Sequence, residues 1–207
     1  MQNLIGIDFS IVKTAACILS DNNYFFYLWP KDLSDKDIAI LNKVGVDVTS
    51  RENIEIVDKV RYDIVNANIL SDLIINSLMP FINKDTRIAF EGASFSSKGN
   101  ATISIMTWKY LLIYKLSLLV SIDNIFTYYP MSVKSTAGCA TKDKKGKDSM
   151  IKAFGESCSE HSLGLTIKTN PDILKKKINY MAGIDDLADA YWVIQTLILK
   201  ENLKVKE

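Results

Sequence analysis

The sequence predicts a mixed α/β fold, in which helices cover a central sheet. Two short apolar runs bounded by polar residues, Leu4–Ser10 and Thr86–Glu91, indicate strands. Longer segments with apolar residues at helical spacing, Asn53–Phe81 and Ile184–Leu199, indicate helices. A continuous apolar run such as Leu4–Ser10 is typical of a strand that is buried on both faces, at the centre of a sheet.

Three strands are expected at the start of the chain. The turn-forming residues 20–23 separate the runs Thr14–Leu19 and Tyr24–Trp29, as a hairpin requires. Together with Leu4–Ser10, these runs predict an antiparallel meander. The remaining expected elements are a short helix near Asp35–Lys43, a helix or pair of helices over Asn53–Phe81 ended by Pro80, a helix at Ala101–Ser121 and a strand at Asn124–Tyr129 closed by Pro130.

Length and composition restrict the class of protein. The 207 residues are enough for a substantial core, and we expect them to form one domain over residues 1–207. Hydrophobic residues make up 48% and charged residues 24%, which is typical of a soluble globular protein. The formal net charge of +1 excludes a global basic field, so a nucleic-acid surface must be a local patch.

Cysteine and histidine usage excludes several kinds of site. Cys17, Cys139 and Cys158 form no CxxC pair, and we expect buried or inert thiols in a reducing compartment. His161 is the only histidine, which leaves little material for a Ser-His-Asp triad or a histidine-rich metal site. We expect it to be an ordinary surface residue.

The sequence indicates neither secretion nor membrane insertion. The N-terminal apolar run is too short for a signal peptide. Lys109 and Lys115 interrupt the longest apolar stretch, Met106–Ile122, so we interpret it as a buried helix. We therefore expect a cytoplasmic or other reducing compartment, and no membrane partner.

Asp8 is unusual because it lies near the end of a strand that we expect to be buried. An ionised carboxylate in such a place is costly to desolvate unless it is paired or holds a cation. Gly6, two residues earlier, leaves room for another backbone or a ligand to approach. Asp8 therefore requires a partner.

Three further carboxylates fit the same pattern. Glu91 ends the second apolar run, and Asp186 and Asp189 share one face of the last helix because they are three residues apart. If the two strands are neighbours and the helix packs across them, the four side chains converge and repel one another unless divalent cations lie among them. Oxygen ligands of this kind select Mg²⁺ or Mn²⁺. Two such ions, about 3.5–4 Å apart, activate a water and stabilise the leaving oxygen of a phosphodiester.

A structural interpretation is also open for each aspartate. Aspartates in the first turn of a helix complement its dipole or cap it, and we favour that role for Asp185. Aspartates at strand ends are common in turns. The metal site therefore rests on four carboxylates in this order on these elements, and not on any one of them.

The order of these motifs resembles that of the RuvC-type Holliday junction resolvases, which belong to the RNase H-like (retroviral integrase) superfamily. The resemblance is carried by Gly-Ile-Asp at 6–8 followed by a hairpin, Ile-Ala-Phe-Glu at 88–91 and Asp-Leu-Ala-Asp-Ala at 186–190. Pro-Met-Ser-Val-Lys at 130–134 resembles the segment that carries an active-site lysine in that family. The resemblance implies an RNase H-like mixed sheet, with three antiparallel strands followed by parallel ones, flanked by helices.

The resemblance also implies roles for particular residues. Two Mg²⁺ ions per active site, for which Mn²⁺ would substitute, would be held by Asp8, Glu91, Asp186 and Asp189. Lys134 would be catalytic, because its ammonium would neutralise the charge that develops on the scissile phosphate. Without the resemblance, Lys134 would be taken for a solvated surface lysine.

The resemblance places DNA contacts in two segments. Residues 134–152 contain six lysines and only two aspartates. Phosphate contacts are implied for Lys134, Lys142, Lys144, Lys145 and Lys147. A solvated loop is the alternative for this cluster. In the loop that follows Glu91, Phe95 is the candidate wedge and Lys98 a further DNA contact. The remaining aromatic residues near these segments, Trp108, Tyr128 and Tyr129, are interpreted as core packing.

The sequence thus predicts a metal-dependent crossover junction endodeoxyribonuclease that acts on four-way DNA junctions. Symmetrical cleavage needs two active sites, so the resemblance implies a homodimer, with the 101–121 helix at the interface. The alternatives are a nuclease of the same fold acting on flaps, other branched DNA or RNA–DNA hybrids, and a catalytically silent DNA-binding subunit. Two features depart from the family: the insert at 30–50 is long, and His161 does not lie beside the last acidic motif.

Overall fold

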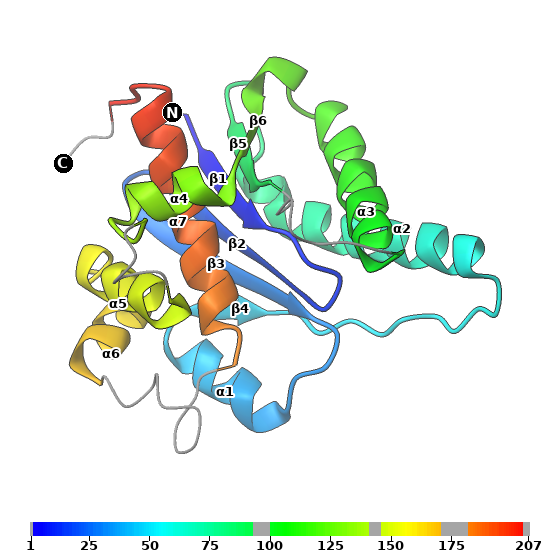
Figure 1. The fold of residues 1–207 in the computed structure, drawn as a ribbon, viewed down its shortest axis with the longest axis horizontal. Coiled ribbons are helices and arrows are strands. Elements are labelled where there is room, and N and C mark those ends of the chain that lie inside the picture. Colours follow the sequence, from blue (N-terminus) through cyan, green and yellow to red (C-terminus); the bar gives the residue numbers. More distant parts are fainter. Residues whose placement is uncertain (1, 93–99, 141–145, 171–181, 205–207) are drawn as a thin grey trace.

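A six-stranded sheet, in the order β4-β3-β2-β1-β5-β6, lies at the centre of the structure, a computed structural model that describes residues 2–92, 100–140, 146–170 and 182–204 (Figure 1). The strands β1 (Leu4–Asp8), β2 (Lys13–Ser20) and β3 (Asn23–Pro30) form an antiparallel meander. The strand β5 (Arg87–Glu91) pairs parallel with β1, and β6 (Ile125–Tyr128) pairs parallel with β5. The predicted fold class, with antiparallel strands followed by parallel ones, is confirmed.

Short-range hydrogen bonds fix the turns of the meander. Asp21 and Asn22 have positive φ angles of 50° and 64°, which suits the two-residue turn between β2 and β3. Between β1 and β2, the Lys13 N–H donates to Ser10 Oγ (2.9 Å), and Ser10 Oγ donates to the Lys13 carbonyl (3.1 Å). Because this turn uses Ser10, β1 ends at Asp8 and not at the predicted Ser10.

The insert after β3 forms a helix and a strand at one edge of the sheet. Helix α1 (Asp35–Lys43) has the predicted bounds, and the Ser34 side chain caps it by accepting from the Asp37 N–H. The strand β4 (Val46–Val48), which pairs parallel with β3, is absent from the prediction because it is only three residues long.

Helices α2 (Lys59–Leu78) and α3 (Asn100–Ser117) cover one face of the sheet. The predicted start of the first helix at Asn53 is wrong, because the Asn66 side chain exchanges hydrogen bonds with the backbone of Ile54 (2.8 and 2.9 Å) and holds that segment outside the helix. As predicted, the segment ends near Pro80, in the 3₁₀ turn Met79–Phe81. The end predicted at Ser121 for the second helix lies four residues too late.

Among the described residues, one segment, Lys59–Phe81, is long and apolar enough to cross a membrane by length and composition, and a third of its most apolar window is buried. Core helices of soluble proteins meet the same criterion. In this fold the segment packs on α3, where Lys115 Nζ lies 2.6 Å from Asp72 Oδ1 and Trp108 Nε1 donates to Asp63 Oδ1 (3.0 Å). The expectation of no membrane partner stays a prediction.

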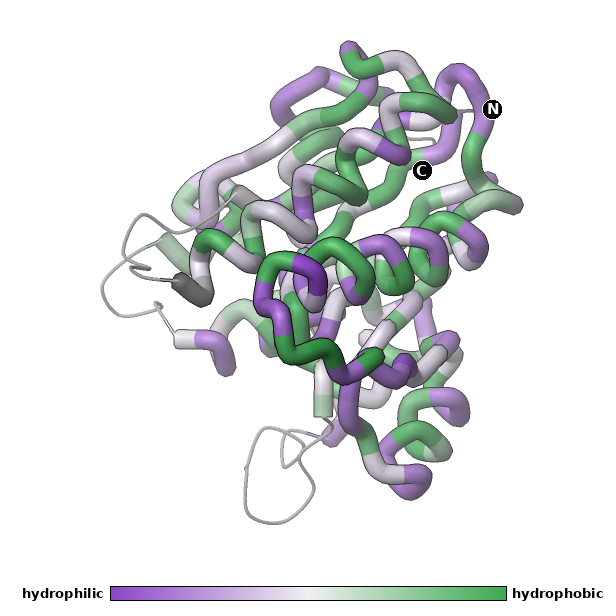
Figure 2. Tube along the Cα trace, turned by 90° about the vertical axis from the view of Figure 1, so that its right-hand side faces the viewer, coloured by the Kyte–Doolittle hydropathy of each residue, from purple (hydrophilic) through white to green (hydrophobic). Residues whose placement is uncertain are grey.

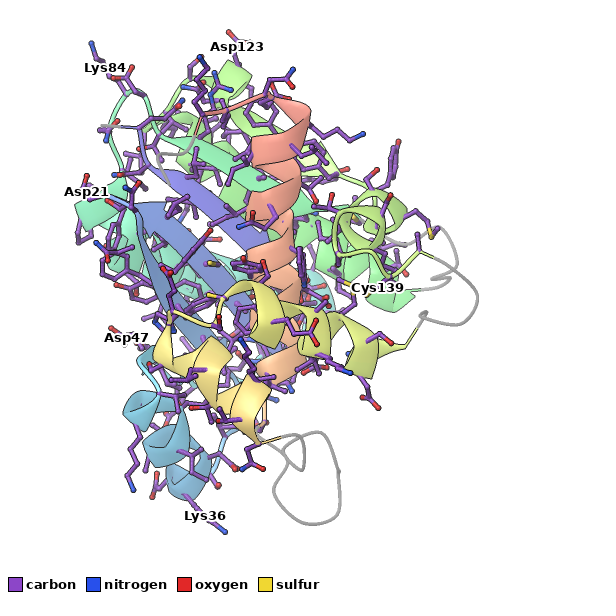
Figure 3. The ribbon with its side chains drawn as sticks, turned by 90° about the vertical axis from the view of Figure 1, so that its left-hand side faces the viewer. Asp21, Lys36, Asp47, Lys84, Asp123 and Cys139 are labelled. Carbon is purple, nitrogen blue, oxygen red and sulfur yellow. The ribbon has the colours of Figure 1, made fainter. Side chains whose placement is uncertain are left out.

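Helices α4 (Pro130–Thr136), α5 (Lys147–Ser157), α6 (Ser162–Thr169) and α7 (Ile184–Lys200) cover the other face. Figure 3 shows α7 lying across the strands; α5 packs against α7, and α6 packs against α5. Helices α4, α5 and α6 are missing from the prediction, whereas α7 begins at the predicted Ile184.

The structure tests the predicted surroundings of several side chains. All three cysteines are buried, and so is Trp108, as predicted. His161 is not an ordinary surface residue, because its Nδ1 accepts the Leu163 N–H (3.1 Å) at the start of α6 and its ring packs on Phe26. Tyr129 is 60% exposed, so its predicted core packing is wrong. Tyr128 is half-buried and stacks on Phe126, as its predicted core role requires.

Gly6 determines where α7 lies. A Cβ atom at this position would be 2.4 Å from the Ala190 carbonyl oxygen and 2.8 Å from Ile194 Cγ1. The backbone of α7 therefore rests directly on β1, which no residue with a side chain would allow. This approach brings the first two turns of α7 to the carboxyl end of β1, where Asp8 lies.

Candidate active site

Two carboxylates lie side by side at the carboxyl ends of the central parallel strands. Ile7 pairs with Phe90 in the ladder between β1 and β5, so the next residues, Asp8 and Glu91, are neighbours. Side chains alternate along a strand, and Gly6 faces α7. Asp8 is two residues further on and therefore faces α7 as well. The same alternation applies to Glu91, because Ala89 belongs to the core on the α7 side.

Helix α7 contributes three more carboxylates from its first two turns. Gly183 caps its N-terminus with a φ of 84°, and a Cβ there would lie 2.7 Å from Leu28 Cδ2, so the start of the helix is packed against the sheet. Asp185 and Asp186 follow in the first turn and Asp189 lies one turn later. The five carboxylates thus come from β1, β5 and α7, three elements that contact one another.

The predicted ligands are difficult to ionise together. Burial raises the pKa of Asp8 well above its usual range, and the charges of Glu91, Asp189 and Asp186, in that order, raise it further. Burial, and then Glu91, raise the pKa of Asp189 to about 7. Burial, and then Asp185, raise the pKa of Asp186 to about 6. A site with these properties binds cations favourably, because a cation removes both the repulsion and the cost of burial.

Two of the predicted lysines lie close enough to influence these carboxylates. Lys134, on α4, is half-buried. Burial raises the pKa of Glu91, and the charges of Lys134, Lys109 and Lys147 oppose that rise. Lys134 thus lies near enough to Glu91 to act on it electrostatically, and its role on a phosphate stays a prediction.

Lys147, the first residue of α5, is bonded to Asp185. Its Nζ donates to Asp185 Oδ2 at 2.5 Å, and this bond raises the pKa of Lys147. Burial is the largest influence on Asp185 and raises its pKa, but the hydrogen bond from Lys147, the charges of Lys147 and Lys13 and a backbone hydrogen bond together outweigh burial, and the net change is a decrease. Asp185 therefore does more than complement the helix dipole, because it fixes α5 to α7 beside the site. A phosphate contact by Lys147 would compete with this ion pair.

Sequence reasoning missed two further cations. Lys13, on β2, lies 3.4 Å from Asp186 Oδ2, and nothing in the sequence connects these residues. Lys109, on α3, is 4% exposed and donates to the Glu91 carbonyl. Burial lowers the pKa of Lys109 to about 8, although Asp8 and Glu91 oppose that change. A charged residue in an otherwise apolar helix was the signal for Lys109.

Five predicted DNA contacts lie outside the described residues: Phe95, Lys98, Lys142, Lys144 and Lys145. The segments that contain them follow β5 and precede α5. Each segment therefore adjoins an element that carries a residue of the site, Glu91 in one case and Lys147 in the other.

The donor set fits divalent cations in its chemistry. Four carboxylates without histidine or cysteine match the oxygen preference of Mg²⁺ and Mn²⁺. Asp186 Oδ2 is buried and has no hydrogen-bond partner among the described residues, so it retains a lone pair for a cation. In the part of the chain that the structure describes, no three His, Cys, Asp or Glu side chains are arranged to enclose an ion. The carboxylates would therefore have to draw closer together around one.

Comparison with known proteins bears on the fold. No protein-family model and no curated protein matches the sequence. Solved structures do match: RuvC of T. thermophilus in complex with a Holliday junction substrate has a TM-score of 0.53 at 12% identity, over 97% of this chain and 95% of that chain. A second Thermus thermophilus RuvC structure has a TM-score of 0.50 at 14% identity, over 97% and 96% of the two chains.

The yeast mitochondrial Holliday junction resolvase Ydc2 is also similar, with a TM-score of 0.50 at 14% identity over 93% of this chain and 76% of that chain. These similarities cover nearly the whole described fold. The resemblance to RuvC-type resolvases, inferred above from the motifs, is confirmed at the level of the fold.

The Asp189→Asn variant should be more stable than the wild type at pH 8 without metal, by about 1–3 kcal/mol. Asp189 has a folded pKa of about 7 against a usual 3.8, so its ionisation opposes folding, and the wild type loses stability as the pH rises through that interval. The gain should therefore be larger at pH 8 than at pH 5. Urea unfolding in EDTA at the two pH values measures it.

The exposed residue Asp123 provides the matched control, since Asp123→Asn should change the stability little at either pH. If Asp189→Asn destabilises the protein equally at both pH values, Asp189 is a structural residue and the electrostatic account of the site is wrong.

Proposed function

We propose that this protein is a metal-dependent endonuclease that hydrolyses phosphodiesters in branched DNA, with the four-way junction as its substrate. One observation carries the proposal: Asp8, Glu91, Asp186 and Asp189 are crowded together at the ends of β1 and β5 and the start of α7, at raised pKa values. A protein without a use for cations gains nothing from this arrangement, because the repulsion costs stability.

The residues of the site divide between holding the cations and binding the phosphate. The four carboxylates would hold Mg²⁺ or Mn²⁺, which supply an activated water and stabilise the leaving oxygen when bound. Lys134 would offset charge on the scissile phosphate from the Glu91 side of the site. The Asp185–Lys147 pair holds α5 against α7, and this fixes one wall of the site.

The choice of substrate is supported by the structural similarity. One similar protein is RuvC in complex with a Holliday junction substrate, and another is a mitochondrial Holliday junction resolvase. Flaps, RNA–DNA hybrids and silent DNA binding remain alternatives that the substrate comparison below separates. All four carboxylates are present, which favours an active enzyme over a silent subunit.

Cleavage at two symmetric positions calls for two active sites, and we propose a homodimer through α3. This helix exposes three large apolar side chains at helical spacing, Ile103, Tyr110 and Tyr114, and Leu118 follows its end; each is more than half exposed. On the adjacent α2, Val60 and Ile64 are exposed as well. Figure 2 views the molecule from the side on which Figure 1 draws these two helices. A second copy would bury these exposed apolar side chains.

Asp8→Asn should slow cleavage of a labelled four-way junction in Mg²⁺ by at least about a thousandfold, because the ligand at the centre of the site loses its charge. Junction binding should stay within about threefold of the wild type. Cleavage and gel-shift assays measure these quantities, with EDTA and Mn²⁺ arms. Asp47→Asn, at an exposed position away from the site, should leave both unchanged.

A flap, a plain duplex and an RNA–DNA hybrid are assayed in parallel. Paired symmetric nicks in the junction alone support the resolvase, whereas cuts in the flap or hybrid overturn the substrate and keep the metal chemistry. Binding without cleavage of any substrate indicates the silent subunit. Full activity in Asp8→Asn would contradict the proposed site.

The double variant Tyr110→Glu/Tyr114→Glu should convert a dimer to a monomer in sedimentation velocity, because two charges would be buried at the proposed interface. The side chains are mostly exposed in one protomer, so circular dichroism should show an intact fold. Lys36→Glu, at an exposed position on α1 and remote from α3, is the control. A monomeric wild type would contradict the proposed dimer. So would a wild type that floats with lipid vesicles when the double variant does not.

A further inference from the structure

Lys13 is held at the edge of the candidate site by its backbone. Its N–H and carbonyl are both bonded to Ser10 Oγ, and it pairs with Pro30 in the ladder between β2 and β3. The Thr14 hydroxyl donates to the Ser10 carbonyl at 2.7 Å and tightens the same turn. Because Ser10 follows Asp8 by two residues, the turn that fixes Lys13 begins just after a candidate ligand.

The ion pair of Lys13 is loose compared with the other lysine pairs. Lys13 Nζ lies 3.4 Å from Asp186 Oδ2, and that oxygen is buried without a hydrogen-bond partner. The pairs Lys59–Asp63, Lys115–Asp72 and Lys147–Asp185 have distances of 2.6, 2.6 and 2.5 Å. A charge-assisted hydrogen bond is about 2.7–2.9 Å long. At 3.4 Å, Lys13 therefore offsets the charge of Asp186 without a short charge-assisted hydrogen bond.

A divalent cation and the Lys13 ammonium cannot both stay beside this oxygen. The cation bonds a carboxylate oxygen at about 2.0–2.1 Å and repels the ammonium. The Lys13 side chain is 27% exposed and that of Asp186 is 15% exposed, so the ammonium has a route to solvent and the carboxylate has little. The four-carbon side chain of Lys13 is flexible enough for the ammonium to move away from Asp186.

We propose that Lys13 is a resident counter-ion of Asp186, that a divalent cation displaces it, and that the released ammonium contacts a nonbridging oxygen of the DNA phosphate at the site. The proposal rests on the proposed nuclease function. Lys13 thus compensates the buried carboxylate before the metal binds and adds a positive charge for the phosphate afterwards. Lys147 differs from it, because its tight bond is to Asp185, which is not one of the four predicted ligands.

The test combines metal binding without DNA and cleavage with metal. Lys13→Gln should bind Mn²⁺ more tightly, by about threefold to fivefold in electron paramagnetic resonance titrations, because a competing cation is removed. At saturating Mn²⁺ the same variant should cleave a four-way junction at least about tenfold more slowly. Lys13→Arg should recover part of the cleavage. A residue with a merely structural role would not improve one property while it impairs the other.

Lys115→Gln is the matched control, because it removes a lysine from the Asp72 pair between α2 and α3 and should alter neither property. Weaker Mn²⁺ binding by Lys13→Gln, or unchanged cleavage at saturating Mn²⁺, overturns the proposal. Asp186→Asn separates the two levels of inference. If it impairs both properties and Lys13→Gln changes neither, only the role of Lys13 is wrong. If Asp186→Asn also changes neither, the proposed function fails as well.

Discussion

The contact between α7 and β1 at Gly6 is the constraint on which the candidate site depends. The Ala190 carbonyl occupies the space of a missing Cβ, so the helix lies at backbone distance from the central strand. That approach sets the first two turns of α7 over the ends of β1 and β5, and the carboxylates of all three elements then face one volume. A larger residue at position 6 would move α7 away from the sheet and separate Asp186 and Asp189 from Asp8. The packing of α7 on β1 in the core therefore also determines the positions of the carboxylates at the ends of the strands.

The same packing creates an electrostatic problem, and the surrounding cations reduce it only in part. Lys109 donates to the Glu91 carbonyl at the end of β5, and Lys134 lies near Glu91. Lys13 and Lys147 pair with aspartates of α7. The pKa values of Asp186 and Asp189 nevertheless remain raised, to about 6 and about 7. Part of the negative charge of the carboxylates is thus left without compensation, and divalent cations would balance it. Sites that bind and react are commonly destabilising in this way, because the groups they need are unfavourable without a ligand.

Local pattern was sufficient to predict the elements that form the centre of the fold. The apolar runs and turn residues locate β1, β2, β3, β5 and β6, and the stripe of α7 locates the last helix. Local pattern failed where contacts between separate segments decide the structure. Asn66 holds Ile54 outside α2. Helices α4, α5 and α6 are short and mixed in composition, and their buried faces form only when α4 and α5 pack on α7 and α6 packs on α5. In the site, the four carboxylates were predictable because each ends or opens an apolar element. The bond between Asp185 and Lys147 joins residues 38 positions apart, and no spacing rule connects them. The same holds for Lys13 and Asp186.

The central claim is that the carboxylates of β1, β5 and α7 hold divalent cations, and crystals soaked in Mn²⁺ test it most directly. Anomalous difference density collected at the manganese edge reports only the position of the metal. The account predicts a peak within bonding distance of carboxylate oxygens of Asp8 and of at least one α7 aspartate, and the loss of this peak in Asp8→Asn crystals. A peak elsewhere on the surface, or no peak at this site at pH 8 with millimolar Mn²⁺, would contradict the account.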